Sequence, residues 1–273
     1  TISFDTSATT IHSSTSGVRD IGAAYDSNAD RTLVAYGLKT GSEIGKAVAV
    51  QVNSDGSLSQ GTPETVESDA CYAFQGTVYD PDAQKSAIFY NNNGTTKGRV
   101  ATINPNTNGV DFGTSTQITS SGSSDFAAAH DPVNDKIIVA YQNGSDNKGY
   151  LVVATISGTS ISFGTKVQYT ANEVFGNKSV YDSENGKVVI VYRDLNTSNY
   201  MRAIVGTISG TSVSFGSPVT VASTTFTNDP MDYGVTYDSN LGNIVVAFVD
   251  TGNSDYGTYV VGSVSGTSSS WGS

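Results

Sequence analysis

The sequence predicts an all-β protein, a single five-bladed β-propeller with four-stranded antiparallel blades. The first observation is a motif that begins Val-x-x-x-Ser-Gly-Thr, ends in Phe-Gly or Trp-Gly, and occurs at 153–164, 205–216 and 261–272. The second is a Tyr-Asp pair, once replaced by His-Asp, whose aspartates are 54, 51, 51 and 56 residues apart. The third is that each period of about 50 residues holds four strand-like segments, a pattern typical of propeller repeats.

Each period, numbered here as repeats one to five, is predicted to form one blade. An apolar run ends at the Tyr-Asp pair, a second run is rich in Val, Ile and Ala, a third leads into Ser-Gly-Thr, and a fourth follows it. In repeat four these segments read KSVYD, KVVIVYRD, MRAIVGTISG and SVSFGSPVTV. Within one domain of 273 residues, the predicted blades cover residues 12–67, 68–118, 119–170, 171–222 and 223–273.

The first segment of the chain, residues 1–11, resembles a fourth strand that has no third strand before it, with Phe4 at the position of Phe163. An open sheet edge exposes unpaired backbone groups, which natural proteins avoid. We therefore expect residues 1–11 to complete the last blade and close the ring. Because the chain begins at Thr1 without an initiator methionine or a signal peptide, we also expect a processed chain or part of a longer protein.

The composition excludes several classes of function. The net charge is −11, and an acidic surface repels phosphate backbones and anionic lipids, so we expect no nucleic-acid partner and no membrane insertion. No apolar run approaches the length of a membrane span. Cys71 is the only cysteine, which rules out an internal disulfide and fits a small buried residue better than a catalytic thiol.

The aspartate of each Tyr-Asp pair is predicted to be structural. It is followed by a short polar turn in every repeat, as in Asp182-Ser183-Glu184, and an Asp side chain caps such turns by accepting backbone N–H groups. A calcium site at Asp80-Pro81-Asp82 or at 131–135 is the alternative, but both segments lack the glycine and the distal glutamate of a known calcium loop. We expect no metal and no cofactor.

The candidate binding residues lie on the segments that lead into the first strand of each repeat, because these lead-in segments vary between repeats and share one face of a propeller. They offer aromatic rings to stack on sugars and polar groups to bind hydroxyls. The candidates are Arg19, Asp20, Tyr72, Phe74, Gln75, Asp125, Phe126, Phe175, Asn177, Lys178, Asp232 and Tyr233.

Two alternatives use the same residues. In the first, the rings of Phe74, Phe126, Phe175 and Tyr233 pack between neighbouring blades instead of binding a ligand. In the second, the chain is a glycoside hydrolase of the five-bladed propeller type, in which Asp20, Asp125, Glu173 and Asp232 face one another around the axis. The flanking residues create no distinct acid and base environments, so a catalytic role is not favoured.

The segments KVVIVYRD and GTISGTSVSFGSPV, together with the recurring YDS and YDP, resemble a propeller repeat common in virion proteins of marine and freshwater bacteriophages. Those proteins are tail-fibre or capsid-appendage chains. The resemblance implies an extracellular location on a virion, with a role in host attachment or decoration and with other virion proteins as partners. It carries no catalytic residues.

The interpretation favoured by the sequence is therefore a non-catalytic extracellular module that binds a surface glycan or a host receptor. The glycoside hydrolase is the second hypothesis, and a structural virion decoration protein without a ligand is the third.

Overall fold

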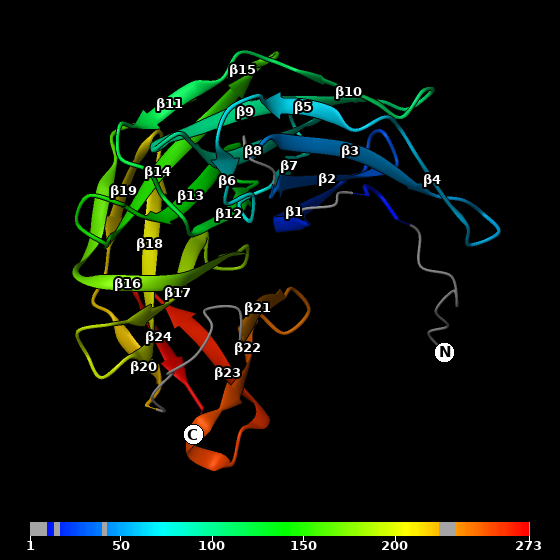
Figure 1. Cartoon of the computed structure of the whole chain (residues 1–273). Helices are drawn as coiled ribbons and strands as arrows, with labels where there is room; N and C mark the ends of the chain where they lie inside the picture. Colours follow the sequence, from blue (N-terminus) through cyan, green and yellow to red (C-terminus); the bar gives the residue numbers. More distant parts are fainter. Residues whose placement is uncertain (1–9, 14–16, 40–42, 224–232, 273) are drawn as a thin grey trace. The chain divides into compact units, whose positions relative to one another are not determined.

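The computed structural model describes residues 10–13, 17–39, 43–223 and 233–272, which belong to two compact units. Unit 1 comprises residues 1–122 and 156–161, and unit 2 comprises residues 123–155 and 162–273. The described residues are organised in β-strands, with one 3-10 turn, η1 (Thr251–Asn253) (Figure 1). Among them, no helix has the length and hydrophobicity needed to cross a membrane.

Unit 1 contains two antiparallel sheets, the first drawn in blue in Figure 1. The sheet of repeat one has the order β1-β2-β3-β4, with β5 also paired to β3. Its strands are β1 (Val18–Asp26), β2 (Arg31–Leu38), β3 (Gly45–Val52), β4 (Leu58–Gln60) and β5 (Glu64–Glu67). The sheet of repeat two consists of β6 (Cys71–Tyr72), β7 (Val78–Asp80), β8 (Lys85–Asn92), β9 (Thr95–Asn104), β10 (Gly109–Phe112) and β11 (Thr116–Thr119).

Unit 2 repeats the same strand order. Repeats three and four form one sheet of β12 (Phe126–Asp131), β13 (Lys136–Gln142), β14 (Lys148–Ser157), β15 (Ser160–Phe163), β16 (Val167–Asp182), β17 (Lys187–Asp194), β18 (Tyr200–Ser209), β19 (Ser212–Phe215) and β20 (Val219–Ala222). Repeat five follows with the sheet order β21-β22-β23-β24, formed by β21 (Tyr233–Asp238), β22 (Asn243–Asp250), β23 (Tyr256–Ser265) and β24 (Ser268–Trp271).

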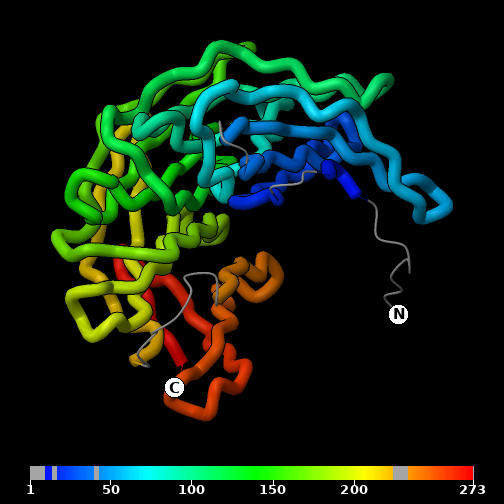
Figure 2. The backbone as a smooth tube through the Cα atoms, viewed as in Figure 1, coloured from blue at the N-terminus to red at the C-terminus, as the bar shows by residue number. Residues whose placement is uncertain are grey.

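Repeats three and four share a sheet because β16 is continuous across the predicted boundary between residues 170 and 171. Its first half pairs with β14 and its second half with β17. Figure 2 traces the backbone of this region in yellow-green. The pairing with β17 shifts register between Phe175 and Lys178, where Gly176 has a φ of 71°. The predicted lead-in loop of repeat four is therefore a bulged strand, because this glycine lets the chain bend without leaving the sheet.

Within each unit, the core lies between successive repeats. The second strands read as nearly continuous apolar runs, and in β13 the residues from Ile137 to Tyr141 are all completely buried. This pattern is expected of strands that are covered on both faces. Cys71 belongs to the core of unit 1, where burial raises the pKa of its thiol, so the structure confirms a packing residue.

The recurring Gly that ends the sequence motif has a clear structural role. The fourth strand of repeats one to four is broken into two pieces at this glycine, and both pieces pair with the third strand. A Cβ at these glycines would clash with a backbone carbonyl oxygen in the turn between the third and fourth strands of the next repeat. The pairs are Gly61 with Asn108, Gly113 with Thr159, Gly164 with Thr211, and Gly216 with Thr267. The final glycine of one copy of the motif thus contacts the Ser-Gly-Thr turn of the next copy.

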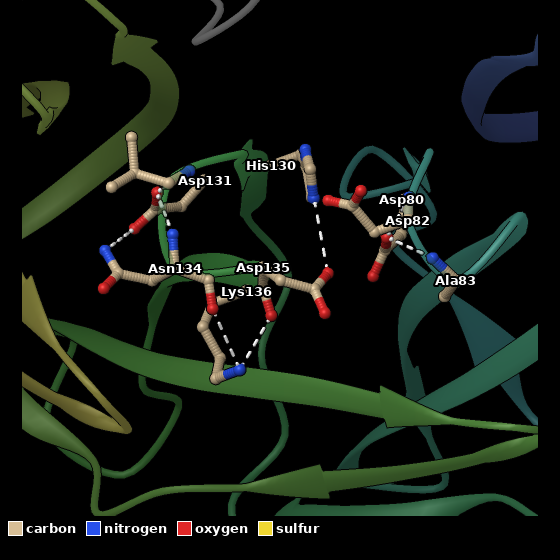
Figure 3. Close-up of polar contacts among 9 residues, drawn as sticks. Asp80, Asp82, Ala83, His130, Asp131, Asn134, Asp135 and Lys136 are labelled. Atoms are coloured by element: carbon tan, nitrogen blue, oxygen red, sulfur yellow. Dashed lines mark hydrogen bonds and ion pairs between the residues drawn. The ribbon is translucent and has the colours of Figure 1, made fainter.

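The aspartates of the Tyr-Asp pairs cap turns, as predicted. In all five repeats the Oδ1 atom accepts the backbone N–H groups two and three residues further on, from Asp26, Asp80, Asp131, Asp182 and Asp238. Figure 3 shows two of these turns, in which Ala83 donates to Asp80 and Asn134 donates to Asp131. Two of the oxygens that the calcium alternative would use, Oδ1 of Asp80 and Oδ1 of Asp131, are therefore hydrogen-bonded to the backbone.

The tyrosine of the pair supports the turn of the preceding repeat. The Tyr79 hydroxyl accepts the Asn28 N–H at 3.3 Å, and the Tyr237 hydroxyl accepts the Glu184 N–H at 3.2 Å. Repeat three carries His130 at this position, and its Nε2 atom lies 3.9 Å from Oδ1 of Asp135. The pair therefore joins the turn within a repeat to the next repeat, which explains why it recurs.

Replacing Asp182 by Ala should lower the free energy of unfolding by about 1 kcal/mol, because a buried acceptor of backbone N–H groups is lost. Ligand binding should be unchanged. The measurement is denaturant unfolding beside a binding titration, with Asn185→Ala as a milder control because only its side-chain bond to Asp182 disappears. A binding defect at normal stability would contradict the structural role.

The predicted closure by residues 1–11 falls largely outside the described residues, since residues 1–9 and the comparison of Phe4 with Phe163 belong to that part of the chain. In repeat five the first piece of the fourth strand is β24, whose Trp271 stands opposite Gly262 as Phe215 stands opposite Gly206 in repeat four. Repeat five therefore supplies the first piece of its own fourth strand.

Candidate functional site

The lead-in segments contact the loops between second and third strands, as the predicted binding face requires. In unit 1 the Cys71 N–H donates to the Glu43 carbonyl at 2.7 Å, and in unit 2 the Val174 N–H donates to the Asn147 carbonyl at 2.9 Å. The two acceptor residues, Glu43 and Asn147, both have positive φ, a conformation that is uncommon for residues other than glycine. Within each unit, the lead-in segment of one repeat is therefore bonded to the loop of the repeat before it.

Three of the five candidate aromatic rings are buried. The exposed fractions of Phe74, Phe126 and Tyr233 are 0%, 1% and 7%. Phe74 stacks on Tyr90 with ring centroids 5.8 Å apart, and Phe126 contacts Tyr141 at 6.2 Å. These rings cannot stack on a ligand in this conformation. Phe74 and Tyr233 pack against the preceding repeat, as the packing alternative expects, whereas Phe126 packs on Tyr141 of its own repeat.

Among the candidate rings of unit 1, Tyr72 is partly exposed, and the guanidinium group of Arg19 lies over its face. The guanidinium carbon of Arg19 lies 4.7 Å from the ring centroid of Tyr72, and Arg19 Nη2 forms an ion pair of 2.8 Å with Glu43 Oε1. All three side chains are partly exposed. Sequence reasoning missed Glu43, because it lies in the loop between the second and third strands, where no motif marks it.

In the described lead-in segments of unit 2, the aromatic rings of Phe175 and Tyr233 each lie close to a cationic side chain. The guanidinium carbon of Arg193 lies 5.3 Å from the ring centroid of Phe175, its opposite residue on the neighbouring strand, and both are partly exposed. The Lys178 ammonium lies 5.6 Å from the buried ring of Tyr233. Sequence reasoning also missed Arg193, because only the strand register places it opposite Phe175.

Two of the four carboxylates proposed for the hydrolase alternative, Asp20 and Asp125, hold neighbouring segments together. In unit 1, Asp20 accepts the Ala73 N–H at 3.2 Å and the Gln75 amide at 3.4 Å. In unit 2, Asp125 Oδ2 accepts the backbone N–H of Asn177 at 2.8 Å and its side-chain amide at 2.7 Å. The same contact thus recurs between repeats one and two and between repeats three and four. Asp232, the remaining aspartate of this set, lies outside the described residues.

Asp125 lies in a distinct electrostatic environment. Burial raises its pKa to about 6, and the Asn177 N–H and the Lys178 charge oppose this rise. The hydroxyl groups near it are committed elsewhere, since Tyr169 donates to Asn177 Oδ1 and Tyr233 donates to the Gly176 carbonyl. A raised pKa would suit a general acid, but the acid must also reach a substrate. Here Oδ2 of Asp125 instead holds Asn177 in position by accepting its backbone N–H and its side-chain amide.

The comparisons with known proteins concern the fold. No protein-family model matches the chain, and no curated protein matches it. A solved structure of a protein from Lactobacillus plantarum is similar, with a TM-score of 0.64 and 11% identity over 92% of this chain and 69% of that one. This likeness supports an all-β fold of the propeller type.

Two further solved structures are more distant. An engineered GH43 glycoside hydrolase with endo-xylanase and exo-arabinofuranosidase activity has a TM-score of 0.49 and 10% identity, over 89% of this chain and 49% of that one. A mutant of the Synechocystis apocarotenoid oxygenase has a TM-score of 0.42 and 9% identity, over 92% of this chain and 64% of that one. The chain thus spans about half the length of the hydrolase, and neither likeness bears on activity.

Proposed function

We propose that the chain is a non-catalytic extracellular module that binds a surface glycan or host receptor through its lead-in segments. The observation that carries the proposal is the pair of partly exposed rings with stacked guanidinium groups, Tyr72 with Arg19 and Phe175 with Arg193. A ring face binds the apolar face of a sugar, and the nearby polar groups bind hydroxyls. The setting on a phage particle, beside other virion proteins, rests on the resemblance of the repeat.

The fold proposed for this module is one closed five-bladed propeller, with residues 1–11 completing the last blade. Support comes from the strand order, which recurs five times in the described residues, and from the inter-repeat glycine contacts. Support also comes from Ile11, which packs against the cluster of Tyr36, Leu38 and Val48 in repeat one.

The hydrolase alternative is less favoured because two of its four carboxylates already have partners. Asp20 and Asp125 accept hydrogen bonds from neighbouring lead-in segments, and replacing either one should first disturb that contact. A structural decoration protein without a ligand is the other alternative, and it predicts no retained glycan in any assay.

Replacing Tyr72 or Phe175 by Ala should abolish detectable glycan binding at one ring site while leaving the fold intact. Losing a ring contact costs on the order of 1–3 kcal/mol, which is a large part of a weak glycan affinity. A glycan array on the native chain identifies the ligand, and titration calorimetry compares the variants. Tyr72→Phe and Phe175→Tyr are matched controls, because each keeps its ring.

Product analysis of the same mixtures separates the hypotheses. Binding that disappears with one ring and survives in its matched control, without any product, supports the module. Release of a shorter saccharide by the native chain would instead support the hydrolase. If no glycan binds the native chain, or if both alanine variants bind as tightly as it does, the ring and cation pairs are not the site.

A further inference from the structure

The Tyr72 site of unit 1 holds one cation between two carboxylates. Arg19, whose guanidinium group lies over the Tyr72 ring, forms an ion pair of 2.8 Å with Glu43 Oε1 through its Nη2 atom. Its Nε atom lies 3.5 Å from Oδ2 of Asp20. The side chains of Arg19, Asp20 and Glu43 are only 28%, 27% and 36% exposed, so water and salt screen their charges incompletely. Because two carboxylates face one guanidinium, this cluster carries a net charge of −1.

Backbone hydrogen bonds hold both acidic residues next to the ring. The Glu43 carbonyl accepts the N–H of Cys71, the residue before Tyr72, at 2.7 Å. Oδ2 of Asp20 accepts the N–H of Ala73, the residue after Tyr72, at 3.2 Å. The two acidic residues are therefore attached to the lead-in segment on either side of the ring residue. A ligand that stacks on the ring meets both of their charges.

An uncharged sugar suits this arrangement. A guanidinium group has five N–H donors, so Arg19 can donate to sugar hydroxyls while it remains paired with Glu43. A carboxylate accepts hydrogen bonds only, and the sugar hydroxyls can donate to its remaining lone pairs. Donor and acceptor thus lie side by side at the ring, and neighbouring hydroxyl groups can use both without breaking an ion pair.

An acidic sugar is disfavoured at the same place. Its carboxylate could pair with Arg19 Nη2 only by displacing Glu43, and the displaced carboxylate would stay attached to a loop that is bonded to Cys71. Like charges this close repel each other, and partial burial strengthens the repulsion. Asp20 adds to it, because its bond to the Ala73 N–H keeps it in place. The cluster therefore discriminates against anions although it contains an arginine, a side chain that commonly binds carboxylates.

We propose that the Tyr72 site selects uncharged sugars, and that Glu43 sets this selectivity by neutralising Arg19. The inference rests on the proposed function, because it names the class of ligand for one of the two ring sites. Removing the charge of Glu43 leaves Arg19 opposed by Asp20 alone. Glu43→Gln should therefore admit an acidic sugar that the native chain rejects.

The test is a glycan array on the full chain with matched pairs, each an uncharged saccharide beside the same saccharide with one uronate. Binding that disappears in Tyr72→Ala reports this site. For the native chain we expect the uncharged member to bind about tenfold more tightly or better, because like charges suppress the wrong partner. Glu43→Gln should lower this affinity ratio to about threefold or less, and Glu43→Asp, which keeps the charge, should retain most of it.

Glu64→Gln is the matched control. Glu64 is exposed on β5 of the same unit, and its replacement changes the net charge by the same amount. We expect it to leave the affinity ratio unchanged. Salt at about 0.5 M should lower the ratio of the native chain, because ions screen the repulsion, and should leave the affinity for the uncharged sugar as it was. Thermal unfolding shows whether each variant is folded, and a ratio of two affinities is not altered by a general loss of binding.

Other outcomes overturn the inference in distinguishable ways. If the Tyr72-dependent binding of the native chain includes acidic sugars as tightly as uncharged ones, the site does not exclude anions, while the proposed binding module stands. A ratio that survives in Glu43→Gln, or that falls equally in Glu64→Gln, shows that Glu43 does not set the selectivity. If no glycan binds the native chain, or if Tyr72→Ala changes no binding, the proposed function fails at this site and the inference fails with it.

Discussion

Phe126→Ala should lower the free energy of unfolding by about 3–5 kcal/mol, because it removes a fully buried ring from between packed strands. Typical domains have only about 5–15 kcal/mol of stability, so the loss is a large fraction of the total. The ring contacts Tyr141 and begins β12, where Ala127 and Tyr141 are also buried. Urea unfolding followed by tyrosine fluorescence or circular dichroism measures the change.

Phe175→Ala is the matched control, since it removes the same ring from a partly exposed position. We expect it to cost less than half as much stability and to lose ligand instead. If Phe126→Ala unfolded like the native chain but lost its glycan, the ring of Phe126 would face a ligand, and our assignment of the two phenylalanines would be reversed.

Gly216→Ala should also be strongly destabilising, by about 3 kcal/mol, because its Cβ would overlap the Thr267 carbonyl oxygen. Two backbone segments meet there, and neither can move aside as a flexible side chain would. The same substitution at Gly61, Gly113 or Gly164 should act in the same direction, since each glycine meets a carbonyl of the following repeat. Thermal unfolding of each variant provides the measurement.

Gly234→Ala is the control for this series, because a Cβ at Gly234 would meet no atom within 4 Å. Its expected effect is neutral or slightly stabilising, since alanine restricts the unfolded chain more than glycine does. If Gly216→Ala and Gly234→Ala lost the same amount of stability, backbone entropy, and not the contact between repeats, would explain why glycine is required at position 216.

The sequence by itself determined the all-β fold, the period of the repeat and the role of its aspartates. These features are local. Alternating apolar residues encode strands, and the Asp182 carboxylate caps backbone groups only two and three residues away. The buried second strands could also be predicted from the sequence. A run such as IIVAY at 137–141 is apolar throughout because both faces of the strand are covered.

The tertiary structure decided which candidate residues are available to a ligand. Phe126 and Phe175 both lie in lead-in segments. Only the packing of β12 on β13 and of β16 on β17 shows that the first ring is buried and that the second is partly exposed beside Arg193. The contacts of these rings join residues 15 and 18 positions apart on paired strands, so no local pattern records them. The recurring glycine is a second example. The sequence shows its position, but the carbonyl oxygen that leaves no room for a Cβ belongs to the following repeat.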